Sequence, residues 1–189
     1  LKATGERDKI RPLLQAVPKI AENNPFIHEL YIKNHPPTPW EDNEIAIYCG
    51  PGFTNWSPKR LSDPKEAFIG GSEEAVILMT KELAKLGWKV TVYADPGDDE
   101  AEYDGVKWKP YYKFNKLDNF NIVIIWRQIG YVDQNLKAKK IYIWNHDIQL
   151  PHDWTKERVD KITKAFFLSK WHRDNIPSLP EEKVFLTSN

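Results

Sequence analysis

The chain has 189 residues, enough for one α/β domain with an extension but too few for two full domains. Basic and acidic residues balance at 27 each, so the net charge gives no reason to expect nucleic acid or an anionic membrane as the main partner. Apolar runs such as 122–126 are too short to cross a bilayer, and no transmembrane segment is predicted. The single cysteine, Cys49, argues against a disulfide framework or a cysteine metal site, so we expect a reducing, cytoplasmic location.

Residues 1–40 form a distinct N-terminal extension. Apolar residues over 10–20 recur at weakly helical spacing and predict one or two helices. The segment 35–40 has three prolines in four positions, which favours either a linker or a strap lying on the domain. The chain begins at Leu1 rather than Met and reaches Asn189 without a closing element, so we expect both ends to be boundaries within a longer protein.

From residue 41 onward, strand and helix signals alternate, which is typical of a parallel sheet with right-handed crossovers. We therefore predict, over 41–189, a doubly wound, mainly parallel, Rossmann-like α/β domain with helices on both faces. The long loop 50–69 and the stretch 95–120 are expected to be largely irregular. Strands are predicted near 45–49, 88–94, 106–108, 122–126, 141–144, 165–168 and 184–186, and short helices near 132–138, 155–162 and 171–176.

The strongest helix signal follows Gly70-Gly71. Ser72 is the expected N-cap, and two glutamates in the first turn suit the positive end of the helix dipole. Gly87 is the expected stop. The apolar face of this helix is predicted to consist of Ala75, Met79, Leu83 and Leu86.

Polar residues at the carboxyl ends of the predicted strands are the candidate binding residues, because open parallel α/β sheets bind ligands at that edge. If the predicted topology is right, residues that are scattered in the sequence converge there. The candidates are Gly70, Gly71, Ser72, Arg127, Gln128, Asn145, His146, Asp147 and Ser169.

Each candidate has a functional and an ordinary interpretation. Gly70 and Gly71 would let an anion approach backbone N–H groups at a helix start, or they simply form a turn. Arg127 suits bidentate binding of a phosphate or carboxylate, or it pairs with a surface acid. His146 is suited to contact a sugar hydroxyl or to act as an acid or base, or it ties down its own loop.

Other classes of site are disfavoured by sequence context. The glycines of 50–52 lack the third glycine of a dinucleotide fingerprint, and Ser169 has no nucleophile-elbow setting. The pairs His146-Asp147 and His152-Asp153 resemble metal-binding pairs of helical phosphohydrolases, but here the first pair ends a strand and Pro151 breaks any helix between the two. No metal site is predicted.

Taken in order, several segments resemble the N-terminal domain of the retaining GT-B glycosyltransferases of family four. Gly70-Gly71-Ser72-Glu73-Glu74 is similar to the family's Gly-Gly-x-Glu helix start, and 83–93 is similar to its Leu-x-x-x-Gly-His-x-Val stretch. Asn145-His146-Asp147 stands where the family has a histidine after a strand. The segments 165–173 and 184–189 resemble its serine-and-short-helix region and the run into its interdomain crossing. The likeness covers about 45–189.

The resemblance implies transfer of a sugar from a nucleotide-sugar donor to an acceptor with retention, without a metal or cofactor. His146 would be the catalytic contact to the transferred sugar, and the backbone near Gly70 and Gly71 would face the donor. Ser72, Arg127, Asn145, Asp147 and Ser169 would contact donor or acceptor. The family's nucleotide pocket lies in a C-terminal donor-binding domain, so the resemblance implies that this chain alone is inactive and binds nucleotide-sugar weakly.

Two other functions fit the same fold. A non-catalytic Rossmann-like module would bind a nucleotide or sugar without transferring it. An NAD-dependent enzyme would carry an acidic residue after its second strand, and Asp95 has that place, although the glycine pattern does not match. Neither the donor sugar nor the acceptor is identified by the sequence.

Overall fold

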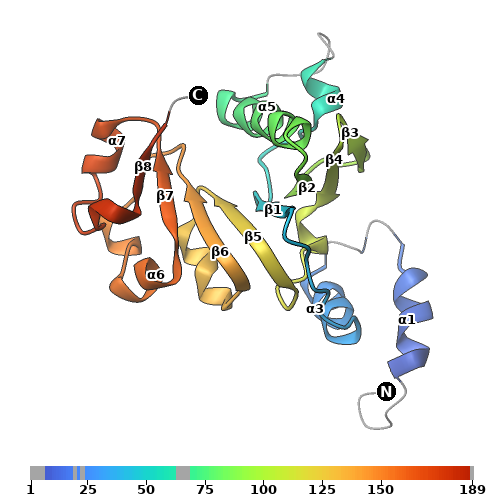
Figure 1. Cartoon of the computed structure of the whole chain (residues 1–189). Helices are drawn as coiled ribbons and strands as arrows, with labels where there is room; N and C mark the ends of the chain where they lie inside the picture. The colour runs from blue at the N-terminus through green and yellow to red at the C-terminus, as the bar shows by residue number, and fades with distance from the viewer. Residues whose placement is uncertain (1–6, 19–20, 22–23, 63–68, 188–189) are drawn as a thin grey trace.

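The computed structural model describes residues 7–18, 21, 24–62 and 69–187. One sheet of eight strands organises the chain, in the order β3-β4-β2-β1-β5-β6-β7-β8 (Figure 1). All neighbours are parallel except β3 and β4, which pair antiparallel. The predicted α/β class with a mainly parallel sheet is therefore confirmed. The strands are β1 (Glu44–Tyr48), β2 (Lys89–Ala94), β3 (Ala101–Tyr103), β4 (Val106–Pro110), β5 (Asn119–Trp126), β6 (Lys137–Trp144), β7 (Lys164–Phe167) and β8 (Val184–Leu186).

The sheet grows outward from β1 in both directions, so right-handed crossovers place the connections on opposite faces. Helix α5 (Gly71–Lys85) connects β1 to β2 on one face. The connections after β5 lie on the other face. They comprise η2 (Ile129–Gln134), η3 (Pro151–Asp153), α6 (Lys156–Lys161), α7 (Lys170–Asp174) and η4 (Glu181–Lys183); α4 (Pro58–Leu61) and η1 (Tyr111–Lys113) complete the domain.

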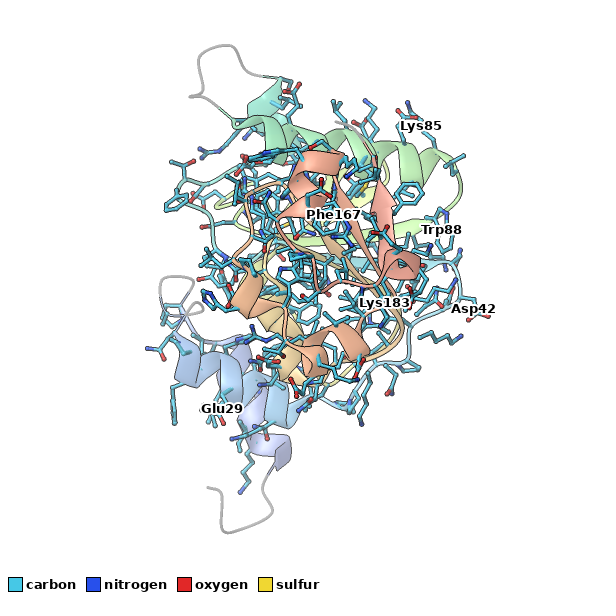
Figure 2. All side chains as sticks on the ribbon, turned by 90° about the vertical axis from the view of Figure 1, so that its left-hand side faces the viewer. Glu29, Asp42, Lys85, Trp88, Phe167 and Lys183 are labelled. Carbon is cyan, nitrogen blue, oxygen red and sulfur yellow. The ribbon has the colours of Figure 1, made fainter. Side chains whose placement is uncertain are left out.

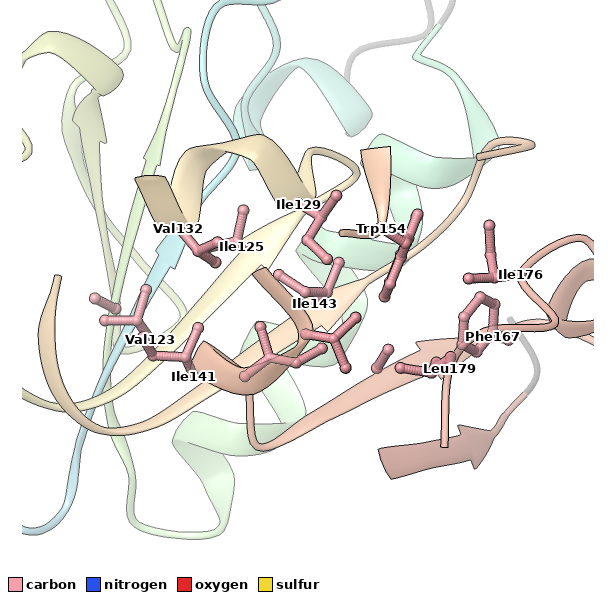
Figure 3. Close-up of a cluster of buried hydrophobic side chains, with 14 of the residues drawn as sticks. Val123, Ile125, Ile129, Val132, Ile141, Ile143, Trp154, Phe167, Ile176 and Leu179 are labelled. Carbon is pink, nitrogen blue, oxygen red and sulfur yellow. The ribbon is translucent and has the colours of Figure 1, made fainter. Parts of the chain in front are cut away.

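Two apolar cores sandwich the sheet because successive strand residues point to opposite faces. In β5, Ile124 packs toward α5, whereas Val123 and Ile125 pack toward η2 and α6. Figure 3 shows this second core, with Ile143 beneath Ile129 and Trp154. The side chain of Phe167, which is labelled in Figure 2, is fully buried. Strands buried on both faces explain the nearly continuous apolar runs in the sequence.

Several element boundaries differ from the prediction. The expected helix at 132–138 is a 3-10 helix that ends at Gln134, because Asn135 adopts a left-handed conformation, and strand β6 already begins at Lys137. Strand β4 confirms the strand predicted near 106–108, whereas β3 in the same stretch and α4 in the loop after β1 were not predicted. Leu86, expected on the buried face of α5, is 76% exposed.

The proline-rich segment lies as a strap against the start of β5. The backbone N–H of Thr38 donates to Asp118 Oδ1 at 2.9 Å, and the Trp40 indole donates to Asp118 Oδ2 at 3.2 Å. Asp118 is buried, so its carboxylate anchors the strap to the domain. Before the strap, α1 (Arg7–Gln15) packs on α3 (Pro25–Asn34), which in turn contacts η1.

Some expectations fall outside the described residues: the predicted apolar periodicity at 19–20, the loop at 63–68 and the terminal 188–189. Within the parts that the structure describes, no helix combines the length and apolar character needed to cross a bilayer.

Candidate functional site

A cleft of about 750 Å³ opens at the carboxyl edge of the sheet, between the loops that follow β1, β5 and β6. This is the edge at which open parallel sheets bind ligands. Its charged residues are Glu73 from the first turn of α5, Arg127 directly after β5, Asp147 after β6, Asp153 from η3 and Arg158 from α6. Sheet topology thus brings together groups that lie far apart in the chain.

Arg127 holds these elements together. Its Nε lies 2.9 Å from Asp147 Oδ2, its Nη1 lies 3.5 Å from Glu73 Oε1, and its Nη2 donates to the Ser72 hydroxyl. The guanidinium carbon also lies 3.7 Å from the ring centroid of Trp126, a cation–π contact. The carboxylates of Glu73 and Asp147 therefore both contact the guanidinium of Arg127, which is the group that would bind an anionic ligand.

The backbone of Arg127 is in the left-handed region, with φ of 68°. This conformation costs a residue with a Cβ roughly 1 kcal/mol or more. Because strand β5 ends at Trp126, this turn redirects the chain and aims the Arg127 side chain across the edge toward α5. Strained backbone of this kind clusters at functional sites.

The start of α5 differs from the prediction, because the N-cap is Gly70 and not Ser72. Gly70 has an extended conformation and offers no side chain to cap the helix, so the first N–H groups depend on outside acceptors. The Ser72 hydroxyl instead donates to Glu73 Oε2 at 2.9 Å and accepts from Arg127. A Cβ on Gly71 would meet nothing within 4 Å, so the space beside this residue is open.

His146 directly follows β6, and its ring lies between two indoles. The ring centroids are 4.5 Å from Trp144 and 6.0 Å from Trp126. Both ring nitrogens are buried and have no hydrogen-bond partner among the described residues. Burial, reinforced by the nearby Arg127 charge, lowers the pKa of His146 to about 4. The imidazole is therefore neutral at physiological pH and can donate one hydrogen bond and accept another.

The remaining candidates are largely occupied by structural roles. Asn145 is fully buried, and its backbone N and side-chain Nδ2 both donate to the Phe166 carbonyl, at 3.0 and 3.2 Å. Its Oδ1 has no partner in the described chain. The Ser169 hydroxyl caps α7 by accepting from the N–H of His172 at 3.1 Å. Gln128 lines the cleft as a neighbour of Arg127.

The structure therefore gathers Ser72, Arg127, Asp147 and the first turn of α5 into one network with His146 beside it, while Ser169 serves its own helix. Sequence reasoning missed Glu73 as a partner of Arg127 and Trp126 as its stacking platform. The signal for Glu73 was its place in the first helical turn, next to the glycines. Nothing in the sequence indicated the left-handed turn at Arg127.

In the described ranges, no group of three or more His, Cys, Asp or Glu side chains is arranged to hold a metal ion. His152 Nε2 lies 3.9 Å from Asp153 Oδ1, and both side chains are substantially exposed. Comparison with protein-family models, curated proteins and solved structures found no significant match.

Proposed function

We propose that this chain is the acceptor-side, N-terminal half of a retaining GT-B glycosyltransferase that takes a sugar from a nucleotide-sugar. The observation that carries the proposal is the unsatisfied imidazole of His146, which directly follows β6 and lies close enough to Arg127, Asp147 and Glu73 to be affected by their charges. A buried polar atom without a partner costs roughly 1–3 kcal/mol, so two such nitrogens at a ligand-binding edge favour a ligand that supplies the missing bonds.

A sugar suits this position chemically. Its hydroxyls both donate and accept, which matches a neutral imidazole with one N–H and one lone pair. The flanking indoles of Trp126 and Trp144 exclude water from the ring, so hydrogen bonds made there count for more than in solvent. In the proposed reaction, His146 orients the transferred sugar or stabilises charge that develops on it.

The first turn of α5 would face the donor's phosphate. Its backbone N–H groups and the helix dipole favour negative charge, and the absence of side chains at Gly70 and Gly71 permits close approach. Arg127 would exchange its contacts with Glu73 or Asp147 for the diphosphate. The resemblance to the family assigns most of the remaining donor contacts to a second domain, so weak binding by this chain is part of the proposal.

Ligand-observed NMR tests the proposal. UDP- and GDP-sugars are expected to show saturation transfer from the protein and to shift the ring nitrogens of His146, whereas NAD is expected to do neither. Gly71→Ala should weaken this binding with unchanged stability, because Gly71 is exposed and its Cβ would meet no protein atom within 4 Å. Gly130→Ala is the control at a glycine of η2 and not of α5, where the Cβ would make only ordinary contacts with Arg158.

Two outcomes would contradict the proposal. Binding of NAD in place of nucleotide-sugars would favour a nucleotide-dependent enzyme of another class. Sugar binding that leaves the His146 ring unshifted and is insensitive to Gly71→Ala would place the ligand elsewhere, as in a non-catalytic sugar-binding module.

A further inference from the structure

A second surface, distinct from the cleft, lies on the α5 face of strands β6, β7 and β8. The connections that follow β5 all pack on the opposite face, as right-handed crossovers require (Figure 1). No helix within the described ranges covers these three strands on the α5 side. The sheet has apolar side chains there without the second layer that such a face usually has.

This uncovered face forms a groove of about 640 Å³. Its floor consists of Trp144, Phe166 and Phe185 on the three strands, with Phe166 and Phe185 centroids 5.5 Å apart. Its wall is the side of α5 that presents Leu78 and Met79. Phe185 is 51% exposed and Leu78 is 50% exposed, so apolar surface from both sides of the groove faces solvent.

The wall of the groove is acidic. Glu74, Leu78 and Glu82 follow one another at four-residue spacing and form a ridge along α5, with the two carboxylates about 12 Å apart along the helix axis. Within the described chain, Glu74 has no ion-pair partner, and Glu82 contacts only the exposed Lys85, at 2.6 Å. An occupant beside α5 would therefore meet an apolar floor and two negative charges along one edge.

We infer that this groove binds an amphipathic α-helix of a partner protein, with apolar residues on the face toward Phe166 and Phe185 and basic residues along the edge toward α5. A helix fits because its apolar stripe, packed alongside α5, would supply the missing layer at ordinary helix–sheet packing. The edge of the partner helix that lies beside α5 should be basic because Glu74 and Glu82 line that side of the groove. This inference does not depend on the proposed glycosyl transfer.

A pair of synthetic helical peptides tests the inference on the intact chain. Each has about 15 residues, because shorter helices are marginal in water, and the two differ only in carrying Lys or Glu along one edge of the same leucine stripe. Fluorescence anisotropy of the labelled peptides is expected to show about tenfold tighter binding of the Lys peptide, since two ion pairs replace two repulsions. Glu74→Lys combined with Glu82→Lys should reverse this preference.

The controls keep charge and hydrophobicity matched. Glu102→Lys combined with Glu157→Lys makes the same change in net charge at exposed sites outside the groove and should leave the preference unchanged. Phe185→Asp should reduce binding of both peptides at least about tenfold, as expected for a central apolar contact. Leu86→Asp, which changes an exposed leucine outside the groove, should leave the binding of both peptides unchanged.

The inference is overturned if neither peptide binds, if both bind equally, or if Phe185→Asp has no effect on binding. It is also overturned if light scattering shows self-association that Phe185→Asp abolishes, because the groove would then be an interface between two copies of this chain.

Discussion

The buried, neutral state of His146 predicts a specific dependence of stability on pH. Burial lowers the pKa of this imidazole to about 4 in the folded chain, from its ordinary value of 6.5. A histidine with a lowered folded pKa contributes stability above pH 6.5, and that stability is lost as the pH falls from 6.5 toward 4, because the unfolded chain then binds a proton that the folded chain does not.

The magnitude follows from the two pKa values. At pH 5 the unfolded imidazole is almost fully protonated and the folded one is almost neutral, which corresponds to about 2 kcal/mol. Because the ring is only partly buried, solvent screening reduces the expected loss to about 1 kcal/mol. Replacing the imidazole by an amide that does not titrate, His146→Gln, should remove this contribution.

Urea unfolding at pH 7 and pH 5 provides the measurement. The drop in unfolding free energy between these pH values should be about 1 kcal/mol smaller in His146→Gln than in the parent chain. His28→Gln is a parallel test outside the site: burial also lowers the pKa of His28, which belongs to the N-terminal extension, so this substitution should also make the drop smaller than in the parent chain. Two results would refute the reasoning. One is an imidazole NMR signal of His146 that titrates near pH 6.5. The other is an equal drop in unfolding free energy, between pH 7 and pH 5, in His146→Gln and in the parent chain.

Three further predictions concern neighbouring contacts. Arg127→Gly should be about 1 kcal/mol more stable than Arg127→Ala in urea unfolding, because only glycine adopts a φ of 68° without strain; equal stabilities would contradict this. Asp118→Ala should cost about 2 kcal/mol and speed proteolysis of the strap, since the N–H groups of Thr38 and Trp40 lose their acceptor; unchanged cleavage would show that other contacts hold the strap. Glu73→Gln should tighten UDP-glucose binding about threefold in NMR titrations by freeing Arg127 from one competing charge; weaker binding would mean that the carboxylate itself contacts the ligand.

The strand pattern was predictable from sequence because a sheet buried on both faces requires apolar residues at nearly every position. The continuous run at 122–126 therefore located most of β5, and a second signal, the alternation of apolar residues in 88–94, located β2. Strand ends were less predictable. The charged start of β6, Lys137-Ala138-Lys139-Lys140, has no apolar signal and is held by parallel pairing with β5, a tertiary effect that local sequence does not reveal.

The sequence predicted that the candidate residues lie at the carboxyl edge of the sheet, but not the contacts that they make there. The rule that ligands bind at the carboxyl edge selected His146 and Arg127 from their place after strands. It gave no information on the ion pairs of Arg127, because these depend on the direction in which a left-handed turn aims the side chain. The N-cap at Gly70 was missed because side-chain preference favours serine, whereas here the Ser72 hydroxyl is recruited by Arg127.

The charges at this edge also bear on how tightly the chain can bind an anion. The N-terminus of α5 and Arg127 both attract negative charge, yet Glu73 and Asp147 already lie against the same guanidinium. An incoming phosphate must displace at least one of them and leave its carboxylate close to the new anion. The negative charges of Glu73 and Asp147 thus offset the positive charges of Arg127 and the helix N-terminus. Tight binding of a phosphate here needs further positive charges from outside this group of residues.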